Sequence, residues 1–465
     1  MESSSAPFER RVVFSLASLY AFRMLGLFML LPVLMLYGQD YQHANPFWLG
    51  LAMGAYGFSQ AVLQIPFGVW SDRIGRKPVI LAGLLIFALG SVVAALADSV
   101  YELIAGRFLQ GCGAISAAVM ALMIDLTSEE KRTRAMATIG ASIGVSFSIA
   151  LVLGPLMAAA WGMASIFWLT ALLALTGIYI LYRVIPEVQP SQTPARDARP
   201  SADLFGATLR HTDLARLNFG IFVLHFILMA SFLVLPLLLE QQLQIPRESL
   251  WKVYLPLLGG AFIAMLPLMI IAEKKRRIKP VFLMAVALLA LMQGALMLAP
   301  QWHFVILPGL FLFFMAFNLL EATLPSWVSK VAPAGAKGTA TGIYSTFQFL
   351  GAFLGGAAGG ALLHHYGQQA VLMVCGLAVL VWLLVAWFMT PPRYLASVLI
   401  PLRGRDGEQL AVRLRSLEGV EEILILPSEQ TVYLKVDPRR IDRQTLTALI
   451  DELPDTGVSA TGSRA

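Results

Sequence analysis

Apolar runs of roughly 20 residues recur along the chain, and they constrain its fold more than any other feature of the sequence. A helix rises about 1.5 Å per residue, so each run is long enough to cross a lipid bilayer. The runs continue to about residue 390, and 58% of the 465 residues are hydrophobic whereas only 13% are charged. A soluble domain of this length could not bury so much apolar surface. The sequence therefore predicts an all-α polytopic membrane protein.

Twelve such segments can be counted, near residues 12–37, 47–67, 78–97, 101–125, 136–160, 163–185, 215–239, 250–272, 280–299, 303–327, 339–364 and 369–390. The first is too long for the apolar part of a signal peptide, so we expect no cleavage. A stretch rich in Pro, Ser and charge separates the sixth segment from the seventh. We therefore expect two six-helix bundles, 1–185 and 213–392, joined by a linker at 186–212.

The loops between these segments alternate in basic content. Three, three and five Lys or Arg residues lie in the loops at 71–77, 128–134 and 273–279, whereas none lies in those at 38–47, 97–101 and 161–165. Basic loops stay in the cytoplasm, which also places both termini there. The net charge of +6 is thus explained by membrane topology, and we assign no nucleic-acid partner. We expect a multi-pass protein of a bacterial-type inner membrane.

The two halves of the chain resemble each other. The motifs "GRKPVIL" at 75–81 and "RIKPVFL" at 277–283 each lie between the second and third segments of their half. Weak internal symmetry of this kind is typical of repeat-built transporters, which bind substrate near the membrane midplane between the halves.

Three motifs resemble those of the major facilitator superfamily. "GVWSDRIGRK" at 68–77 resembles the family signature between spans two and three, and "RFLQGCGA" at 107–114 resembles a second motif in span four. "GPLMAA" at 154–159 matches an antiporter motif only in part, because Ala158 and Ala159 replace two glycines. The resemblance implies the family's 12-helix 6+6 fold, with a central cavity lined by spans one, four, seven and ten.

For the loop at 68–77 the resemblance implies a cytoplasmic latch. Gly68 and Gly75 allow close or bent backbone. Asp72 would face the N-terminus of the eleventh helix near 334–339, and Arg76 would pair with Asp125 at the end of span four. These contacts would hold the outward-facing state and release when the halves rock.

A simpler interpretation treats Arg73, Arg76 and Lys77 as topology determinants at the lipid headgroups. It does not explain Asp72, because acidic residues contribute little to orientation. In the second half, "IAEKKRRIKP" at 271–280 keeps only Glu273 and several basic residues. We therefore expect one working latch and one degenerate copy.

Four ionisable residues lie inside apolar segments, where charge is costly and usually functional. Arg23, Arg107, His225 and Glu321 lie in spans one, four, seven and ten. Arg107 has a structural alternative, in which it holds backbone carbonyls or the nearby Gln110. Arg23 could shape the electrostatics of the cavity without touching substrate.

Proton coupling is assigned to Glu321 or His225. Burial favours the protonated form of a carboxyl group, and histidine titrates near neutral pH. As alternatives, Glu321 could pair with a base, and His225 could be a packing residue. Further polar candidates for the substrate path are Gln60, Gln64, Asn318, Tyr344 and Gln348. So few polar groups among many apolar ones favour an amphiphilic or aromatic substrate over a sugar.

The composition changes after residue 394. Residues 395–457 read as strand, helix, strand, strand and helix, and 458–465 as a tail. This order resembles a small α+β ferredoxin-like (βαββα) metallochaperone domain. The loop "RGRDG" at 403–407, where such domains bind metal, has no Cys, His or Met, so we expect no soft metal there. The domain could regulate the transporter, contact its core or another copy, or only stabilise the chain.

No catalytic or ATP-binding motif is present in the sequence, and the two cysteines, Cys112 and Cys375, lie in apolar segments. We expect no enzyme activity, cofactor or metal. The first hypothesis is a proton-coupled secondary transporter, an exporter of a small drug-like or metabolite substrate. The second is a membrane sensor that signals through the C-terminal domain. Uptake symport and proton-independent facilitated transport on the same fold remain alternatives.

Overall fold

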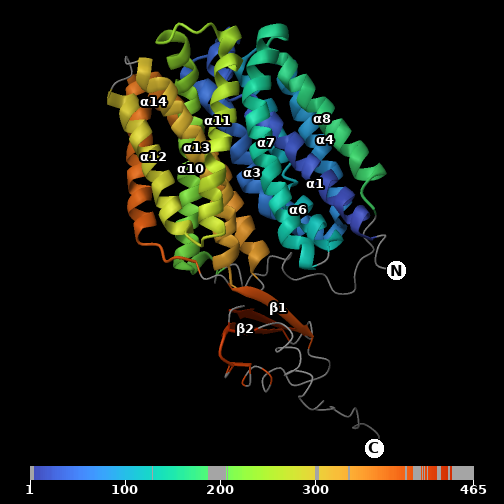
Figure 1. The fold of residues 1–465 in the computed structure, drawn as a ribbon. Coiled ribbons are helices and arrows are strands. Elements are labelled where there is room, and N and C mark those ends of the chain that lie inside the picture. The colour runs from blue at the N-terminus through green and yellow to red at the C-terminus, as the bar shows by residue number, and fades with distance from the viewer. Residues whose placement is uncertain are drawn as a thin grey trace, which may run out of the picture.

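The computed structural model consists of a long helical bundle with a small β-sheet below one end (Figure 1). It describes residues 5–127, 129–186, 206, 208–298, 303–333, 336–392, 395–401, 410, 412, 414–415, 417–426, 431–437 and 440–441. Most of the expected linker at 186–212 and the tail at 458–465 lie outside these residues. We call the bundle end next to the sheet the sheet side, and the opposite end the far side.

The first half contains the helices α1 (Ser5–Phe28), α2 (Leu34–Tyr37), α3 (Pro46–Ile74), α4 (Arg76–Ala95), α5 (Val100–Cys112), α6 (Ser116–Leu126), α7 (Glu129–Trp161) and α8 (Ala164–Arg183), with a short 3₁₀ helix, η1 (Gly38–Asp40). Side-chain caps fix the starts of two of them. The Asn45 side chain accepts a hydrogen bond from the Trp48 N–H at 3.0 Å, and Ser99 forms a reciprocal capping box with Glu102.

The second half contains α10 (Thr212–Gln241), a short 3₁₀ helix η3 (Arg247–Ser249), α11 (Leu250–Glu273), α12 (Ile278–Leu298), α13 (His303–Val331) and α14 (Lys337–Trp387). The 51-residue α14 is bent at Gly367, whose φ of 79° and ψ of −176° are not helical. The sequence predicted a boundary between two spans at this point, and the bend is that boundary.

Ten helical segments in the described part of the chain are long and apolar enough to cross a membrane. One of them is α14, which the bend at Gly367 divides into two spans. The 29-residue α3 is a further span. Its hydropathy is lowered by polar residues that face inward, among them Gln60 and Gln64. The expected twelve-span architecture is therefore confirmed.

Two spans differ in detail from the prediction. The first was expected to run to residue 37, but α1 ends at Phe28 and the chain turns before α2 begins at Leu34. Pro32, which cannot donate a backbone hydrogen bond, lies in this turn. The fourth span is broken between α5 and α6. At that break a Cβ on Gly113 would lie 2.4 Å from the Gly83 carbonyl oxygen, so only glycine fits.

The two halves pack most closely on the far side. A Cβ on Gly50 of α3 would lie 2.5 Å from the Gly356 carbonyl oxygen of α14, and one on Gly54 would lie 2.6 Å from the Phe353 carbonyl oxygen. Small residues thus allow the two backbones to meet. Arg247 of η3, in the second half, also contacts the first half on this side. Its guanidinium carbon lies 4.7 Å from the centre of the Tyr37 ring.

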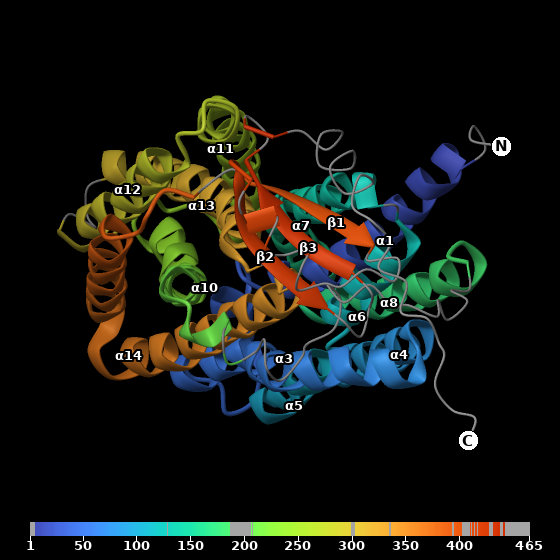
Figure 2. The same cartoon turned by 90° about the horizontal axis from the view of Figure 1, so that it is seen from below.

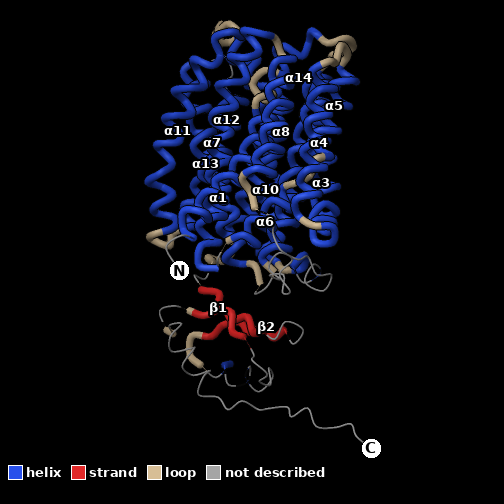
Figure 3. Tube along the Cα trace, turned by 90° about the vertical axis from the view of Figure 1, so that its right-hand side faces the viewer, coloured by secondary structure: helices blue, strands red, loops and turns tan. Residues whose placement is uncertain are grey.

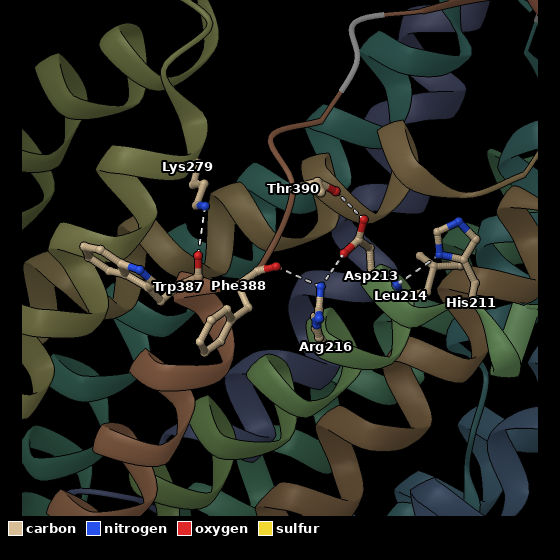
Figure 4. Close-up of polar contacts among 8 residues, drawn as sticks. All are labelled: His211, Asp213, Leu214, Arg216, Lys279, Trp387, Phe388 and Thr390. Carbon is tan, nitrogen blue, oxygen red and sulfur yellow. Dashed lines mark hydrogen bonds and ion pairs between the residues drawn. The ribbon is translucent and has the colours of Figure 1, made fainter.

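The last span is fixed where it leaves the bundle on the sheet side (Figure 4). Lys279 and Arg216 donate hydrogen bonds of 2.9 Å to the carbonyl oxygens of Trp387 and Phe388, respectively. Asp213 accepts hydrogen bonds from Arg216 and from Thr390. Cations at a helix C-terminus are favourable, so this cluster fixes the point from which the chain continues to the sheet.

The C-terminal domain contains β1 (Ala396–Pro401), β2 (Val420–Leu426) and β3 (Thr431–Val436), all antiparallel in the order β1-β3-β2. Figure 3 shows these strands in red, below the helices in blue. A ferredoxin-like domain places its third strand between the first two in this way. Its core contains Val398, Leu410, Leu414, Val432, Leu434, Val436 and Ile441. The expected second helix lies outside the described residues.

A lysine of the sheet contacts the bundle. Lys435 of β3, only 3% exposed, donates a 2.5 Å hydrogen bond to the carbonyl oxygen of Ala332, just beyond the end of α13. Its ammonium also lies 3.3 Å from Glu422. Burial lowers the pKa of Lys435. Viewed from below, the three strands lie across the end of the bundle (Figure 2).

Candidate functional site

Arg23 of α1 is the centre of a buried polar network in the first half. Its Nη1 donates to Ser116 Oγ at 2.8 Å, and its Nη2 donates to Tyr56 Oη at 2.8 Å and to Gln60 Oε1 at 2.6 Å. Gln60 in turn donates to Gln64 at 2.7 Å. The network therefore joins α1, α3 and α6 around one guanidinium group.

Arg107 of α5 lies on the other side of Tyr56. Its guanidinium carbon is 5.2 Å from the centre of the Tyr56 ring, and its Nη1 donates to Gln110 Oε1 at 2.8 Å. Gln110 donates to Ser91 at 2.8 Å. The expected contact between Arg107 and Gln110 is present, and Tyr56 connects the two arginines.

Glu321, His225 and Gln348 form a second buried cluster in the second half. The Gln348 amide nitrogen lies 3.2 Å from Glu321 Oε1 and 2.9 Å from His225 Nε2. His225 Nε2 is also 3.9 Å from Glu321 Oε2. If the amide donates to both neighbours, His225 is neutral with its proton on Nδ1. A carboxyl group and an imidazole thus lie side by side at membrane depth.

The two buried polar clusters both lie near Tyr20. Tyr20 of α1 is close enough to both Arg23 and Glu321 for their charges to act on its hydroxyl group. Tyr344 of α14 is similarly close to Glu321 and Tyr20. Its hydroxyl group is buried and has no hydrogen-bond partner among the described residues. Ionisable and polar groups from both halves therefore meet at one place.

Asn318 is the predicted cavity residue that the structure explains most simply. Its side chain donates to the Phe314 carbonyl oxygen at 2.9 Å, within its own helix α13. This contact satisfies the amide nitrogen without involving the second half's polar cluster.

The loop at 68–77 brings its charged residues together on the sheet side. Arg76 Nε lies 3.0 Å from Asp125 Oδ2, and the Arg76 guanidinium also pairs with Asp72 and donates to Ser71. Gly75 adopts a φ of 99°, which favours glycine, between α3 and α4. The expected pair of Arg76 with Asp125 is therefore present, and both residues belong to the first half.

The structure gives less information on the other residues expected in the latch. A Cβ on Gly68 would lie 3.3 Å from the Ala117 side chain, so this position is close to α6. Arg73 is exposed. Residues 334 and 335, which belong to the segment expected to face Asp72, lie outside the described part of the chain. The latch role of these residues stays a prediction.

The second half contains an ion pair that the sequence analysis missed. Lys330, near the end of α13, lies 2.8 Å from Glu273 at the end of α11, and Ser326 donates to the same carboxylate at 2.6 Å. In the first half the base follows span two and the acid ends span four. Here the acid ends span eight and the base ends span ten. The second copy keeps the pair with the charges exchanged, so the expectation of a merely degenerate copy needs correction.

Sequence reasoning also missed Tyr20, Tyr56 and Ser116. Tyr56 and Gln60 are four residues apart, which places both on one face of α3. That spacing could have indicated a shared partner. No local sequence pattern indicates Ser116. It lies just after the break between α5 and α6 and is 93 residues from Arg23 in the sequence.

Comparison with known proteins places this architecture in a family. The model of the Major Facilitator Superfamily matches residues 16–356, and that of the YajR YAM domain matches residues 397–451. The inner membrane transport protein YajR of Escherichia coli is 45% identical over 439 residues, which cover 94% of this chain and 96% of that protein.

More distant similarities agree with this assignment. Multidrug resistance protein D of E. coli is 33% identical over 144 residues, covering 30% of this chain and 36% of that protein. The crystal structure of the human organic anion transporter MFSD10 has the same fold, with a TM-score of 0.61 at 22% identity, and the match covers 81% of this chain and 99% of that one. The chain therefore belongs to the major facilitator superfamily and is a multi-pass membrane transporter.

Proposed function

We propose that the chain is a proton-coupled secondary transporter that exports a small drug-like or metabolite molecule by alternating access of its two halves. The observation that carries the proposal is the cluster of Glu321, His225 and Gln348. Ionisable side chains inside a membrane are rare and mark ion or substrate pathways. Burial favours the neutral form of a carboxyl group, so Glu321 can take up a proton in one state and release it in another.

The positions of the contacts support an inward-facing state. By the positive-inside rule, the basic loops favour a cytoplasmic position for the sheet side. The far side, where glycines of α3 and α14 meet and Arg247 contacts Tyr37, is then the closed periplasmic side. On the sheet side, the ion pairs of Arg76 and Lys330 each join residues of the same half. Glu321 would therefore exchange protons with the cytoplasm in this state.

Export is the direction that we propose, because a multidrug resistance protein is among the relatives. Uptake symport and facilitated transport use the same fold, and the sign of proton movement separates them. In export by antiport, protons enter a vesicle as the substrate leaves it. Symport moves both in one direction, and a facilitator moves no protons.

A second candidate function is a sensor that signals through the C-terminal domain. The contact of Lys435 with Ala332 favours it, because it links the sheet to the end of α13, the helix that carries Glu321. Ligand-dependent movement of α13 would then reach the domain. In a transporter, the same contact would regulate the rate.

Deletion of residues 395–465 separates the two functions. The truncated and full-length proteins are placed in liposomes that contain a pH-sensitive dye, and pooled candidate substrates are added under a pH gradient. Substrate-dependent proton movement that survives truncation is the result we expect. If neither protein moves substrate or protons, transport is wrong and the sensor becomes the hypothesis to pursue.

A further inference from the structure

Arg23 is a buried cation whose described partners are all neutral. The residue is 1% exposed, and it donates only to a hydroxyl, a phenol and an amide oxygen. Its Nε has no hydrogen-bond acceptor among the described residues. A charge at the centre of a membrane-spanning helix is energetically costly. Neutral acceptors reduce this cost but leave the positive charge in place.

Two other cations of the bundle are paired with carboxylates. Arg76 and Lys330 each lie within 3.0 Å of a carboxylate oxygen. In the part of the chain that the structure describes, no carboxylate lies within 4.0 Å of Arg23 or of Arg107. Both arginines contact Tyr56, one through its hydroxyl group and one over its ring face. The first half therefore presents two positive charges beside one tyrosine, neither of them in direct contact with a carboxylate of the described residues.

A purely structural role does not explain this arrangement. Gln60 Oε1 lies 2.6 Å from Arg23 Nη2, and a glutamate of the same shape at that position would neutralise the guanidinium. Buried ions in proteins are normally paired with a countercharge. The Gln60 amide holds Arg23 by a hydrogen bond and does not neutralise its charge. This arrangement suits a site in which a bound ligand supplies the negative charge.

A chain of buried aromatic side chains leads from α1 to the second cluster. Phe147 of α7 has ring-centre distances of 5.1 Å to Phe28 and 5.0 Å to Phe317. Phe317 is in turn 6.0 Å from His225. Buried aromatic rings of α1, α7 and α13 thus connect to the polar cluster of the second half.

We propose that Arg23 binds the anionic group of a small amphiphilic organic anion, such as a carboxylate or sulfonate. The guanidinium presents fixed N–H donors that match such oxygen pairs. Arg107, which lies over the ring of Tyr56, adds positive potential at the site. The aromatic side chains around Phe147 contact the apolar part of the anion. The inference rests on the proposed transport function, because the site lies where the two halves meet.

The test uses full-length protein in nanodiscs and three probes of nearly the same shape: naphthalene-2-sulfonate, neutral naphthalene-2-sulfonamide and cationic 2-naphthyltrimethylammonium. Binding is measured calorimetrically without any ion gradient. We expect the wild type to bind the sulfonate at least tenfold more tightly than the other two. If the wild type bound the sulfonate no more tightly than the other two probes, this result alone would overturn the proposal.

Two variants locate the site. Arg23→Gln removes the charge, and Gln60→Glu supplies a resident carboxylate without changing shape. Each is expected to weaken sulfonate binding at least tenfold. Gln60→Glu decides the matter if Arg23→Gln does not fold. Arg183→Gln, an equal charge change at an exposed position at the end of α8, is the matched control and should bind like the wild type. Unchanged sulfonate binding in Gln60→Glu would contradict the assignment to Arg23.

Failure of this inference can be told from failure of transport. If liposomes show proton-coupled flux of the cationic or neutral probe but not of the sulfonate, transport stands and the anion site is wrong. If the sulfonate binds at Arg23 but neither it nor protons cross the membrane, the anion site stands and the proposed transport is wrong.

Discussion

Single side chains determine the charge at the centre of the membrane. The hydrogen-bond partners of Arg23, namely Gln60, Tyr56 and Ser116, are neutral and do not offset its positive charge. In the second half, Gln348 lies within hydrogen-bond distance of both Glu321 and His225. One half therefore offers fixed positive charge and the other offers groups that can change protonation state.

The pair of Arg76 with Asp125 gives a prediction about stability. Arg76→Ala removes the guanidinium that pairs with two largely buried carboxylates, Asp72 and Asp125. Hydrogen bonds to charged groups contribute about 2 kcal/mol, so the thermal unfolding midpoint should fall. Arg73→Ala, in the same loop but exposed, is the control and should leave it unchanged. Equal midpoints for the two variants would show that the pair does not stabilise this state.

At the scale of helices and strands, much of the fold could be predicted from the sequence. Hydropathy locates the spans, because each must be apolar over its whole length in lipid. The alternating pattern of residues 395–457 locates the three strands. The break between α5 and α6 could not be predicted, because it depends on the close approach of Gly113 to Gly83, 30 residues earlier.

Contacts within the candidate site were harder to predict from the sequence. Arg76 and Asp125 were paired only through the family resemblance. His225 and Gln348, 123 residues apart, meet only through the packing of α10 against α14. The exchanged pair of Glu273 and Lys330 was missed because the loop motif that carries the first pair is absent. Sequence identified the ionisable residues, whereas tertiary structure determined their partners.

The packing of α3 against α14 can be tested with one methyl group. Gly356→Ala would place a Cβ 2.6 Å from the Gly50 carbonyl oxygen, and backbone cannot easily move aside. Overpacking of this kind costs about 1–3 kcal/mol, so the closed far side should be destabilised. Accessibility of a cysteine introduced at Tyr37 to a membrane-impermeant thiol reagent would rise.

The control lies on the same helix. A Cβ on Gly342 would meet no atom of the described residues within 4 Å. Gly342→Ala should therefore leave the accessibility of position 37 unchanged. If both alanine variants behave alike, close packing at Gly356 does not hold the far side shut.

The contact of the sheet with α13 predicts an effect of Lys435. Lys435→Ala removes its hydrogen bond to the Ala332 carbonyl oxygen at the end of α13. The domain should then be released more often, and proteolysis between residues 388 and 396 should become at least several-fold faster. Arg440→Ala, which removes an exposed ion pair with Glu418, is the control. Equal cleavage rates would show that Lys435 does not hold the domain.

At the scale of the whole molecule, the proposed function makes the structure one state of an alternating-access cycle. The far side is closed by Arg247, which also donates to the Leu36 carbonyl oxygen at 3.4 Å, and by the glycine contacts of α3 and α14. The opposite state requires these contacts to separate while the halves approach on the sheet side. The ion pairs of Arg76 and Lys330 each join residues of a single half.

Cross-linking tests this cycle. Tyr37→Cys and Arg247→Cys are combined in a protein whose Cys112 and Cys375 are replaced by serine. A short cross-linker should join the two positions in the state described here and should block transport. Cross-linking that leaves transport at its full rate would show that the far side need not open.

The most direct test of proton coupling measures proton movement in liposomes that contain a pH-sensitive dye. Wild type, Glu321→Gln and the exposed control Glu418→Gln are compared after addition of the three naphthalene probes under a pH gradient. The account predicts substrate-dependent proton movement in the wild type and in Glu418→Gln, and none in Glu321→Gln, although Glu321→Gln still binds the probe. Proton movement of equal size in Glu321→Gln would contradict the assignment of Glu321 as the proton carrier.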